Sequence, residues 1–133
     1  MKTKPILIVA GEPNSIFFEI FFKTLKIKKF ISPIILIGSY KLLFLQMQKL
    51  NFKKKINLLN LKNLEIKNLN NKSINLINIE YSSKKAFEKI SDKSNKYIKN
   101  SFNTAFKILK MGITNKFING PISKKNFLKK KLP

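Results

Sequence analysis

The chain has 133 residues, enough for one domain with a single hydrophobic core, and 44% of the residues are apolar. It contains no cysteine and no histidine, which excludes a disulfide framework, a thiolate nucleophile, and the commonest general base and metal ligand. The formal net charge is +22, and all 28 basic residues are lysine.

The excess of lysine admits two interpretations. Clustered basic residues bind phosphate backbones, so a lysine-rich domain that binds nucleic acid or another polyanion is one alternative. Proteins that read nucleic acids rely on the bidentate guanidinium, however, and this chain has no arginine. Lysine is also abundant together with Asn, Ile and Phe, all of which have adenine- and thymine-rich codons. We therefore expect a compositional bias and no nucleic-acid partner.

Membrane insertion is not expected. The longest apolar stretches, such as residues 16–22 and 34–37, are far shorter than the roughly 20 residues of a membrane-spanning helix. The amino terminus lacks the apolar core and cleavage site of a signal peptide. The expectation is a soluble cytoplasmic protein without a membrane partner.

Two strand and helix pairs are predicted in the first fifty residues. The short apolar runs 6–10 and 34–37 are typical of strands buried on both faces of a parallel sheet. Asn14 or Ser15 can cap the helix after the first strand, and Ser39 can cap the helix after the second. The side chains at near-helical spacing after these caps are Ile16, Phe17, Ile20, Phe21, Phe22 and Leu25, then Leu42, Leu43, Gln46, Met47 and Leu50.

The second half is predicted to continue the alternation. Residues 52–72 are a low-complexity mixture of Lys, Asn and Leu with a short strand at 56–59, and residues 74–79 form the next strand. The longest periodic segment follows Ser82 or Ser83 and ends at Gly112, a suitable residue just beyond a helix. Its repeating positions are Phe87, Ile90, Ser94, Tyr97, Ser101, Ala105 and Ile108 or Leu109.

A last strand, 117–119, runs into a Gly-Pro turn, after which Ser123 can cap a short helix. Strands that alternate with helices predict an α/β fold with a largely parallel sheet. In such sheets ligands bind beyond the carboxyl ends of the strands. The turns 11–13 and 119–121 both follow strands, so we expect them to open onto that edge.

Two charged side chains near these turns are candidates for binding a substrate. Glu12 follows a buried strand and could hydrogen-bond a substrate or accept a proton, although it could equally be a solvated or capping carboxylate. Lys124 lies just past the second turn, where an ammonium group could pair with a phosphate or carboxylate, although one of 28 lysines could equally be a surface residue.

The same two turns resemble a known family. The segment Gly11-Glu12-Pro13, with Ile16 and Glu19-Ile20 after it, resembles the signature G-E-P-x-G-I-G-P-E-I of 4-hydroxythreonine-4-phosphate dehydrogenases. The segment 119–124 resembles the later T-[AG]-P-[IV]-x-K segment of that family, at about the family's spacing. Residues 1–133 would then be a single α/β unit, the amino-terminal part of a longer two-domain enzyme.

The resemblance implies a three-layer α/β/α fold like that of isocitrate and isopropylmalate dehydrogenases, here incomplete. It implies an oxidoreductase that acts on a CH-OH group of a phosphorylated substrate in pyridoxal phosphate (vitamin B6) biosynthesis. The family uses NAD and a divalent metal, and works as a homodimer. The motif positions carried over as substrate-binding residues are Glu12, Asn119 and Lys124.

The chain also departs from the family. Ser15 and Phe17-Phe18 stand where the family has glycine and a Gly-Pro pair. The family's later Gly-His-Thr-Glu segment and its three metal-binding histidines have no counterpart, so no catalytic, metal-binding or NAD-binding residue is carried over. We expect the chain to be inactive alone. The alternatives are a divergent non-catalytic binding or regulatory relative, and the lysine-rich polyanion-binding domain.

Overall fold

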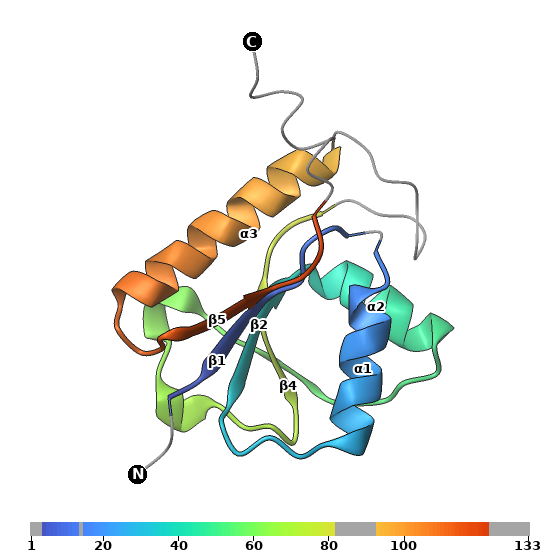
Figure 1. Cartoon of the computed structure of the whole chain (residues 1–133), viewed down its shortest axis with the longest axis horizontal. Coiled ribbons are helices and arrows are strands. Elements are labelled where there is room, and N and C mark those ends of the chain that lie inside the picture. The colour runs from blue at the N-terminus through green and yellow to red at the C-terminus, as the bar shows by residue number, and fades with distance from the viewer. Residues whose placement is uncertain (1–3, 14, 82–92, 123–133) are drawn as a thin grey trace.

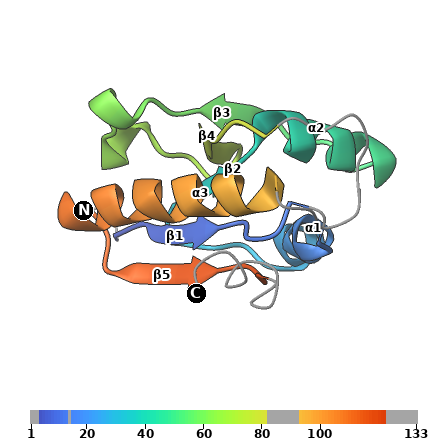
Figure 2. The ribbon, with the colours of Figure 1, turned by 90° about the horizontal axis from the view of Figure 1, so that it is seen from above.

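The computed structural model of this protein describes residues 4–13, 15–81 and 93–122. They contain one five-stranded sheet with the strand order β3-β4-β2-β1-β5, in which every neighbouring pair is parallel. Figure 2 shows this order across the sheet. The strands are β1 (Ile6–Val9), β2 (Ile34–Gly38), β3 (Ile56–Leu58), β4 (Ile74–Asn78) and β5 (Lys116–Asn119).

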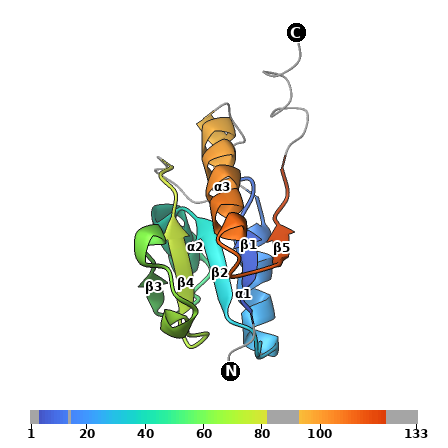
Figure 3. The same cartoon turned by 90° about the vertical axis from the view of Figure 1, so that its left-hand side faces the viewer.

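Three helices cover the two faces of the sheet. α1 (Phe17–Ile27) and α2 (Tyr40–Lys49) lie together on one face, and α3 (Lys93–Lys110) crosses β1 and β2 on the other (Figures 1 and 3). The prediction of an α/β fold with a parallel sheet is confirmed, as is the three-layer arrangement. No helix in the described ranges is long and apolar enough to cross a membrane.

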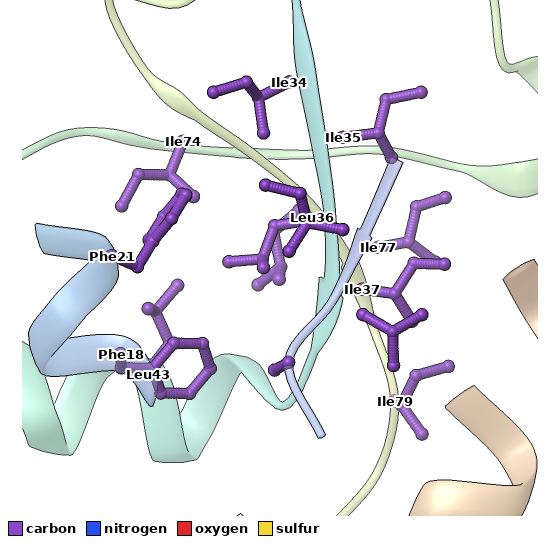
Figure 4. Close-up of a cluster of buried hydrophobic side chains, with 14 of the residues drawn as sticks. Phe18, Phe21, Ile34, Ile35, Leu36, Ile37, Leu43, Ile74, Ile77 and Ile79 are labelled. Carbon is purple, nitrogen blue, oxygen red and sulfur yellow. The ribbon is translucent and has the colours of Figure 1, made fainter. Parts of the chain in front are cut away.

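The central strand β2 explains why this sequence forms a parallel sheet. All five of its residues are buried, and Ile35, Leu36 and Ile37 are completely inaccessible. Since successive side chains of a strand point to opposite faces, Leu36 faces Phe18 and Phe21 of α1 while Ile37 lies on the side of α3 (Figure 4). An unbroken apolar run is therefore required at this position, and the run 34–37 indicated it correctly.

The start of α1 differs from its prediction. Ile16 is the residue that precedes the helix, and its side chain makes no capping hydrogen bond. Ser15, a predicted cap, lies one position too early, although its Oγ still accepts a hydrogen bond from Phe17 N (3.3 Å). Asn14, the other predicted cap, lies outside the described residues. Phe18, Phe21 and Phe22 of this helix are buried in the core, and Phe17 is partly buried against it.

The second predicted cap is confirmed. Ser39 precedes α2, and its Oγ accepts a hydrogen bond from Leu42 N (3.1 Å). The backbone N–H of Ser39 is satisfied from the opposite layer, because it donates to the hydroxyl of Tyr97 on α3 (3.0 Å). One residue thereby joins β2 to helices on both faces of the sheet.

The long predicted helix is α3, of which the structure describes residues 93–110. The predicted periodic face is its buried face, with Ser94, Tyr97, Ser101, Ala105 and Ile108 all shielded from solvent. Gly112 follows the helix with a φ of +77°, as expected for the residue that ends a helix. The predicted positions Ser82, Ser83, Phe87 and Ile90, and the cap Ser123, lie outside the described residues.

The low-complexity segment between β3 and β4 contains two short 3₁₀ helices, Leu61–Asn63 and Ile66–Asn68. Hydrogen bonds of asparagine side chains connect this segment to the sheet. The amide of Asn75, buried within β4, accepts hydrogen bonds from Asn57 Nδ2 (3.0 Å) and Asn70 N (3.2 Å) and donates to Ile34 O (3.0 Å). Asparagines of this low-complexity region therefore form a hydrogen-bond network beside the central strands.

Candidate substrate-binding edge

The two motif turns meet at the carboxyl edge of the sheet. β1 and β5 are parallel neighbours, with Val9 opposite Asn119, so the turns that follow them leave the sheet side by side. Glu12 N donates to Pro121 O (2.7 Å), and Gly120 N donates to Val9 O (2.7 Å). The prediction that both turns open onto one edge is confirmed, and the turns are bonded directly to each other.

Glycine is required on both sides of this contact. Gly11 has a φ of +81°, a conformation that side chains disfavour, and a β-carbon there would lie 2.7 Å from the carbonyl carbon of Gly120. A β-carbon on Gly120 would in turn lie 2.7 Å from the carbonyl carbon of Ala10. The turns are therefore in backbone contact with no side chain between them.

Glu12 is held inside this junction. Its side chain is only 4% exposed, so the interpretation as a solvated surface carboxylate is wrong. The backbone carbonyl oxygen of Glu12 accepts hydrogen bonds from both the Oγ (2.9 Å) and the backbone N (3.3 Å) of Ser15. Ser15, which stands where the dehydrogenase signature has glycine, thus closes the turn that carries Glu12.

Gln46 is a residue of this edge that sequence reasoning missed. It lies on the core-facing side of α2, is completely buried, and points its Nε2 at Pro13 O (3.4 Å). No hydrogen-bond partner for its Oε1 exists among the described residues. The only sequence signal for Gln46 was its amide side chain at one position of a helical pattern otherwise made of Leu and Met. That pattern by itself predicts only a core-facing position.

The structure describes only one of the other two predicted substrate-binding residues, Asn119 and Lys124. Asn119 ends β5 at the same edge, is exposed, and donates from Nδ2 to Gly120 O (3.0 Å). Lys124 lies outside the described residues, so its place relative to Glu12 stays a prediction. The structure thus brings together the turns that carry Glu12 and Asn119.

Phe17 occupies space beside the second turn. A β-carbon on Gly120 would lie 3.0 Å from Phe17 Cδ1, so the phenylalanine ring is in close contact with the Gly-Pro turn. The dehydrogenase signature has glycine here, which would leave this space open. The replacement reduces the room for a ligand beside the Gly-Pro turn.

The described residues do not fit the metal that the resemblance implies. They contain no group of three or more His, Cys, Asp or Glu side chains that could hold a metal ion. The whole sequence has no histidine, and only six residues are acidic. A divalent metal held by this chain alone is therefore not supported, and no chemical step is assigned to one.

Solved structures of other proteins share this fold. The structure of a 4-hydroxythreonine-4-phosphate dehydrogenase from Burkholderia phymatum matches with a TM-score of 0.78 and 16% sequence identity, covering 92% of this chain and 38% of that one. The enzyme of the same description from Klebsiella pneumoniae matches with a TM-score of 0.73 and 17% identity, covering 93% and 39% of the two chains. The chain shares the fold of these dehydrogenases.

The likeness is one of structure and covers part of the larger proteins. No protein-family sequence pattern and no curated protein sequence matches the chain. The chain spans less than two fifths of the length of the two solved structures. The likeness therefore shows a shared fold over part of the length of these proteins.

Proposed function

We propose that this chain is the amino-terminal portion of a 4-hydroxythreonine-4-phosphate dehydrogenase of pyridoxal phosphate biosynthesis, and that it is inactive alone. The observation that carries the proposal is the junction of the turns 11–13 and 119–121. These turns hold the two segments that resemble the dehydrogenase family, and their backbones are bonded to each other at one sheet edge. The shared fold over 92% of the chain supports the same proposal.

In this proposal Glu12, Asn119 and Lys124 bind the phosphorylated substrate. A carboxylate and an amide at the carboxyl edge would hydrogen-bond polar groups of the substrate, and the ammonium of Lys124 would pair with its phosphate or carboxylate. NAD, which accepts hydride in this family, and a divalent metal would be held by residues that this chain does not supply. The complete enzyme would act as a cytoplasmic homodimer.

A first experiment reads the coding DNA beyond the codon of Pro133. The proposal expects an open frame that encodes a Gly-His-Thr-Glu segment and later histidines. The product of that frame, supplied with NAD, a divalent metal and 4-phosphooxy-threonine, should form NADH, while the purified 133-residue chain should not. Turnover by the 133-residue chain at a rate typical of enzymes, about 1 per second or faster, would contradict its assigned inactivity.

Glu12→Gln in the active product tests the site itself. The substitution keeps the size of the side chain and removes its charge, so kcat/KM should fall by about tenfold or more if the carboxylate contacts the substrate. Glu65→Gln is the matched control, because Glu65 is exposed and forms an ion pair with exposed Lys67 (3.3 Å). Equal activity of the two variants would remove Glu12 from the site.

The contact of Phe17 with Gly120 favours one second candidate, a non-catalytic binding or regulatory relative. A ring that fills the space beside the motif turn is unfavourable for a close-fitting substrate but harmless in a protein that only binds a partner. A stop codon directly after Pro133, together with a separate full-length homologue in the same genome, would favour this candidate.

A further inference from the structure

A hollow lies at the opposite end of the sheet from the motif turns. Residues 28–33 precede β2, residues 53–55 precede β3, and residues 70–73 precede β4. Because all the strands are parallel, these three segments meet at the amino edge, near the loop that joins α1 to β2 at the bottom of Figure 1. They surround a cavity of about 420 Å³.

The lining of this cavity is strongly basic. It includes Lys28, Lys29, Lys54 and Lys72 from three separate segments, together with Asn70 and Asn71, and no Asp or Glu. We call these four lysines and two asparagines the basic pocket. Like charges gathered in this way repel one another unless an anion is present. An ammonium group is a point charge that binds phosphate well without the fixed geometry of arginine.

The walls of the basic pocket are held in place by Asn71. Its Nδ2 donates to Phe30 O (3.1 Å) and Ser32 O (2.7 Å), and its Oδ1 accepts from Ile34 N (3.0 Å). One side chain thus ties the segment that carries Lys28 and Lys29 to the segment that carries Lys72. A ligand would meet walls that are already ordered, which lowers the entropic cost of binding.

Two further contacts shape the pocket. The ammonium of Lys28 lies over the ring of Phe30, 5.4 Å from its centroid, which restricts this lysine to the pocket wall. Lys54 also lines an adjoining hollow of about 700 Å³, whose lining combines Phe44, Met47 and Phe52 with Lys53 and Lys55. Basic side chains therefore continue from the basic pocket into this hollow.

We propose that the basic pocket binds the phosphate group of a small phosphorylated ligand. The volume lies within the usual range of small-molecule pockets, about 300–1,000 Å³. Concave shape and ordered walls suit a compact ligand better than a flexible nucleic-acid strand, which binds along an open groove with aromatic platforms. This site is separate from the carboxyl edge and does not depend on the dehydrogenase proposal.

The test compares two variants of equal charge. The pocket variant changes four lysines to Gln, namely Lys28, Lys29, Lys54 and Lys72. The control variant changes four exposed lysines of α3 to Gln, namely Lys96, Lys99, Lys107 and Lys110. Pyrophosphate is titrated into each protein, and into the unmodified chain, at about 0.15 M salt, where distant surface charges are largely screened. Binding is followed by calorimetry and by amide chemical shifts, and circular dichroism verifies that both variants fold.

The expected result is a loss of pyrophosphate affinity of about tenfold or more in the pocket variant and less than about twofold in the control. The amide shifts should concentrate at residues 28–34, 53–55 and 70–73. Equal losses in the two variants, or no binding to the unmodified chain, would overturn the proposal. It would also be overturned by a single-stranded oligonucleotide that binds at the same salt and is not displaced by pyrophosphate, because the basic surface would then serve nucleic acid.

Discussion

Gly11 lies so close to the backbone of Gly120 that it has no room for a β-carbon, and the backbone of Ala10 leaves Gly120 equally little room. A β-carbon on Gly11 would fall 2.7 Å from the carbonyl carbon of Gly120, and Glu12 N bonds to Pro121 O next to this contact. Residues from the two ends of the described chain are thus joined by backbone alone. The contact locks β5 beside β1 and holds Glu12 inside the junction.

The first prediction distinguishes two reasons for glycine at position 11, which are its positive φ and the lack of space for a β-carbon. Gly11→Ala should lower the free energy of unfolding by about 2–4 kcal/mol, because it adds a steric clash to the cost of a positive φ. Gly112→Ala is the control, since Gly112 has nearly the same φ (+77°) but a β-carbon there would meet no atom within 4 Å. The control should cost only about 1 kcal/mol in urea unfolding. Equal costs would show that the two turns are not in contact.

The second prediction concerns the hydrogen bond between α3 and the start of α2. Tyr97→Phe leaves the buried N–H of Ser39 without its acceptor, so the free energy of unfolding should fall by about 1–3 kcal/mol. Tyr40→Phe removes a hydroxyl from a partly exposed ring and should change stability by less than about 0.5 kcal/mol. Urea unfolding of the two variants measures the difference. A Tyr97→Phe cost as small as that of the control would contradict the proposed bond.

The same tyrosine should make stability depend on alkaline pH. Burial raises the pKa of Tyr97 well above its usual value, mainly because the charged form would lose its solvation. Its folded-state pKa is higher than its unfolded-state pKa of about 10, so its contribution is complete below pH 10 and is lost as the pH rises toward the folded-state pKa. The stability difference between the unmodified chain and Tyr97→Phe should therefore shrink between about pH 9 and pH 11. A constant difference would contradict the buried, neutral phenol.

The sequence predicted those parts of the fold that depend on local pattern. Residues 34–37 had to be a strand buried on both faces because no polar side chain interrupts them, and the spacing of Tyr97, Ser101 and Ala105 identified the buried face of α3. The alternation of strands and helices placed the turns 11–13 and 119–121 on the same edge, but their direct contact was found only in the structure.

Long-range relationships could not be predicted in this way. Nothing in the order of the elements shows that β4 inserts between β2 and β3, because strand order depends on how complete layers pack. The hydrogen bonds of the Gln46, Asn71 and Asn75 side chains were also missed. Their partners lie between 5 and 41 residues away in the sequence, and a local pattern does not show such distant contacts.

The third prediction tests Asn71 as the residue that orders the amino edge. Asn71→Ala removes three hydrogen bonds and leaves Ile34 N, Phe30 O and Ser32 O without these partners, so the free energy of unfolding should fall by about 2–4 kcal/mol. Asn103→Ala, at an exposed position of α3, should be neutral or slightly stabilising, because alanine favours helix. Hydrogen exchange should become faster for the amide of Ile34 in the first variant alone. Unchanged exchange there would show that Asn71 does not hold this loop.

The fourth prediction asks whether the amide of Gln46 contributes to folding or is retained for the carboxyl edge. Its only described hydrogen bond is long (3.4 Å, to Pro13 O), and its Oε1 has no partner among the described residues. Gln46→Met keeps the volume and removes a buried polar group, so its stability should stay within about 1 kcal/mol of the unmodified chain. Gln46→Ala leaves a cavity and should cost about 2–4 kcal/mol.

Thermal and urea unfolding of the two Gln46 variants distinguish packing from hydrogen bonding. If Gln46→Met proves as destabilising as Gln46→Ala, the amide itself supports the turn that carries Glu12, and the long bond to Pro13 is stronger than its length suggests. If Gln46→Met is neutral, folding does not require a polar group at the base of this turn. An amide kept at a buried position without a benefit to stability would then be best explained by a ligand that Gln46 or its neighbour Glu12 contacts at the carboxyl edge.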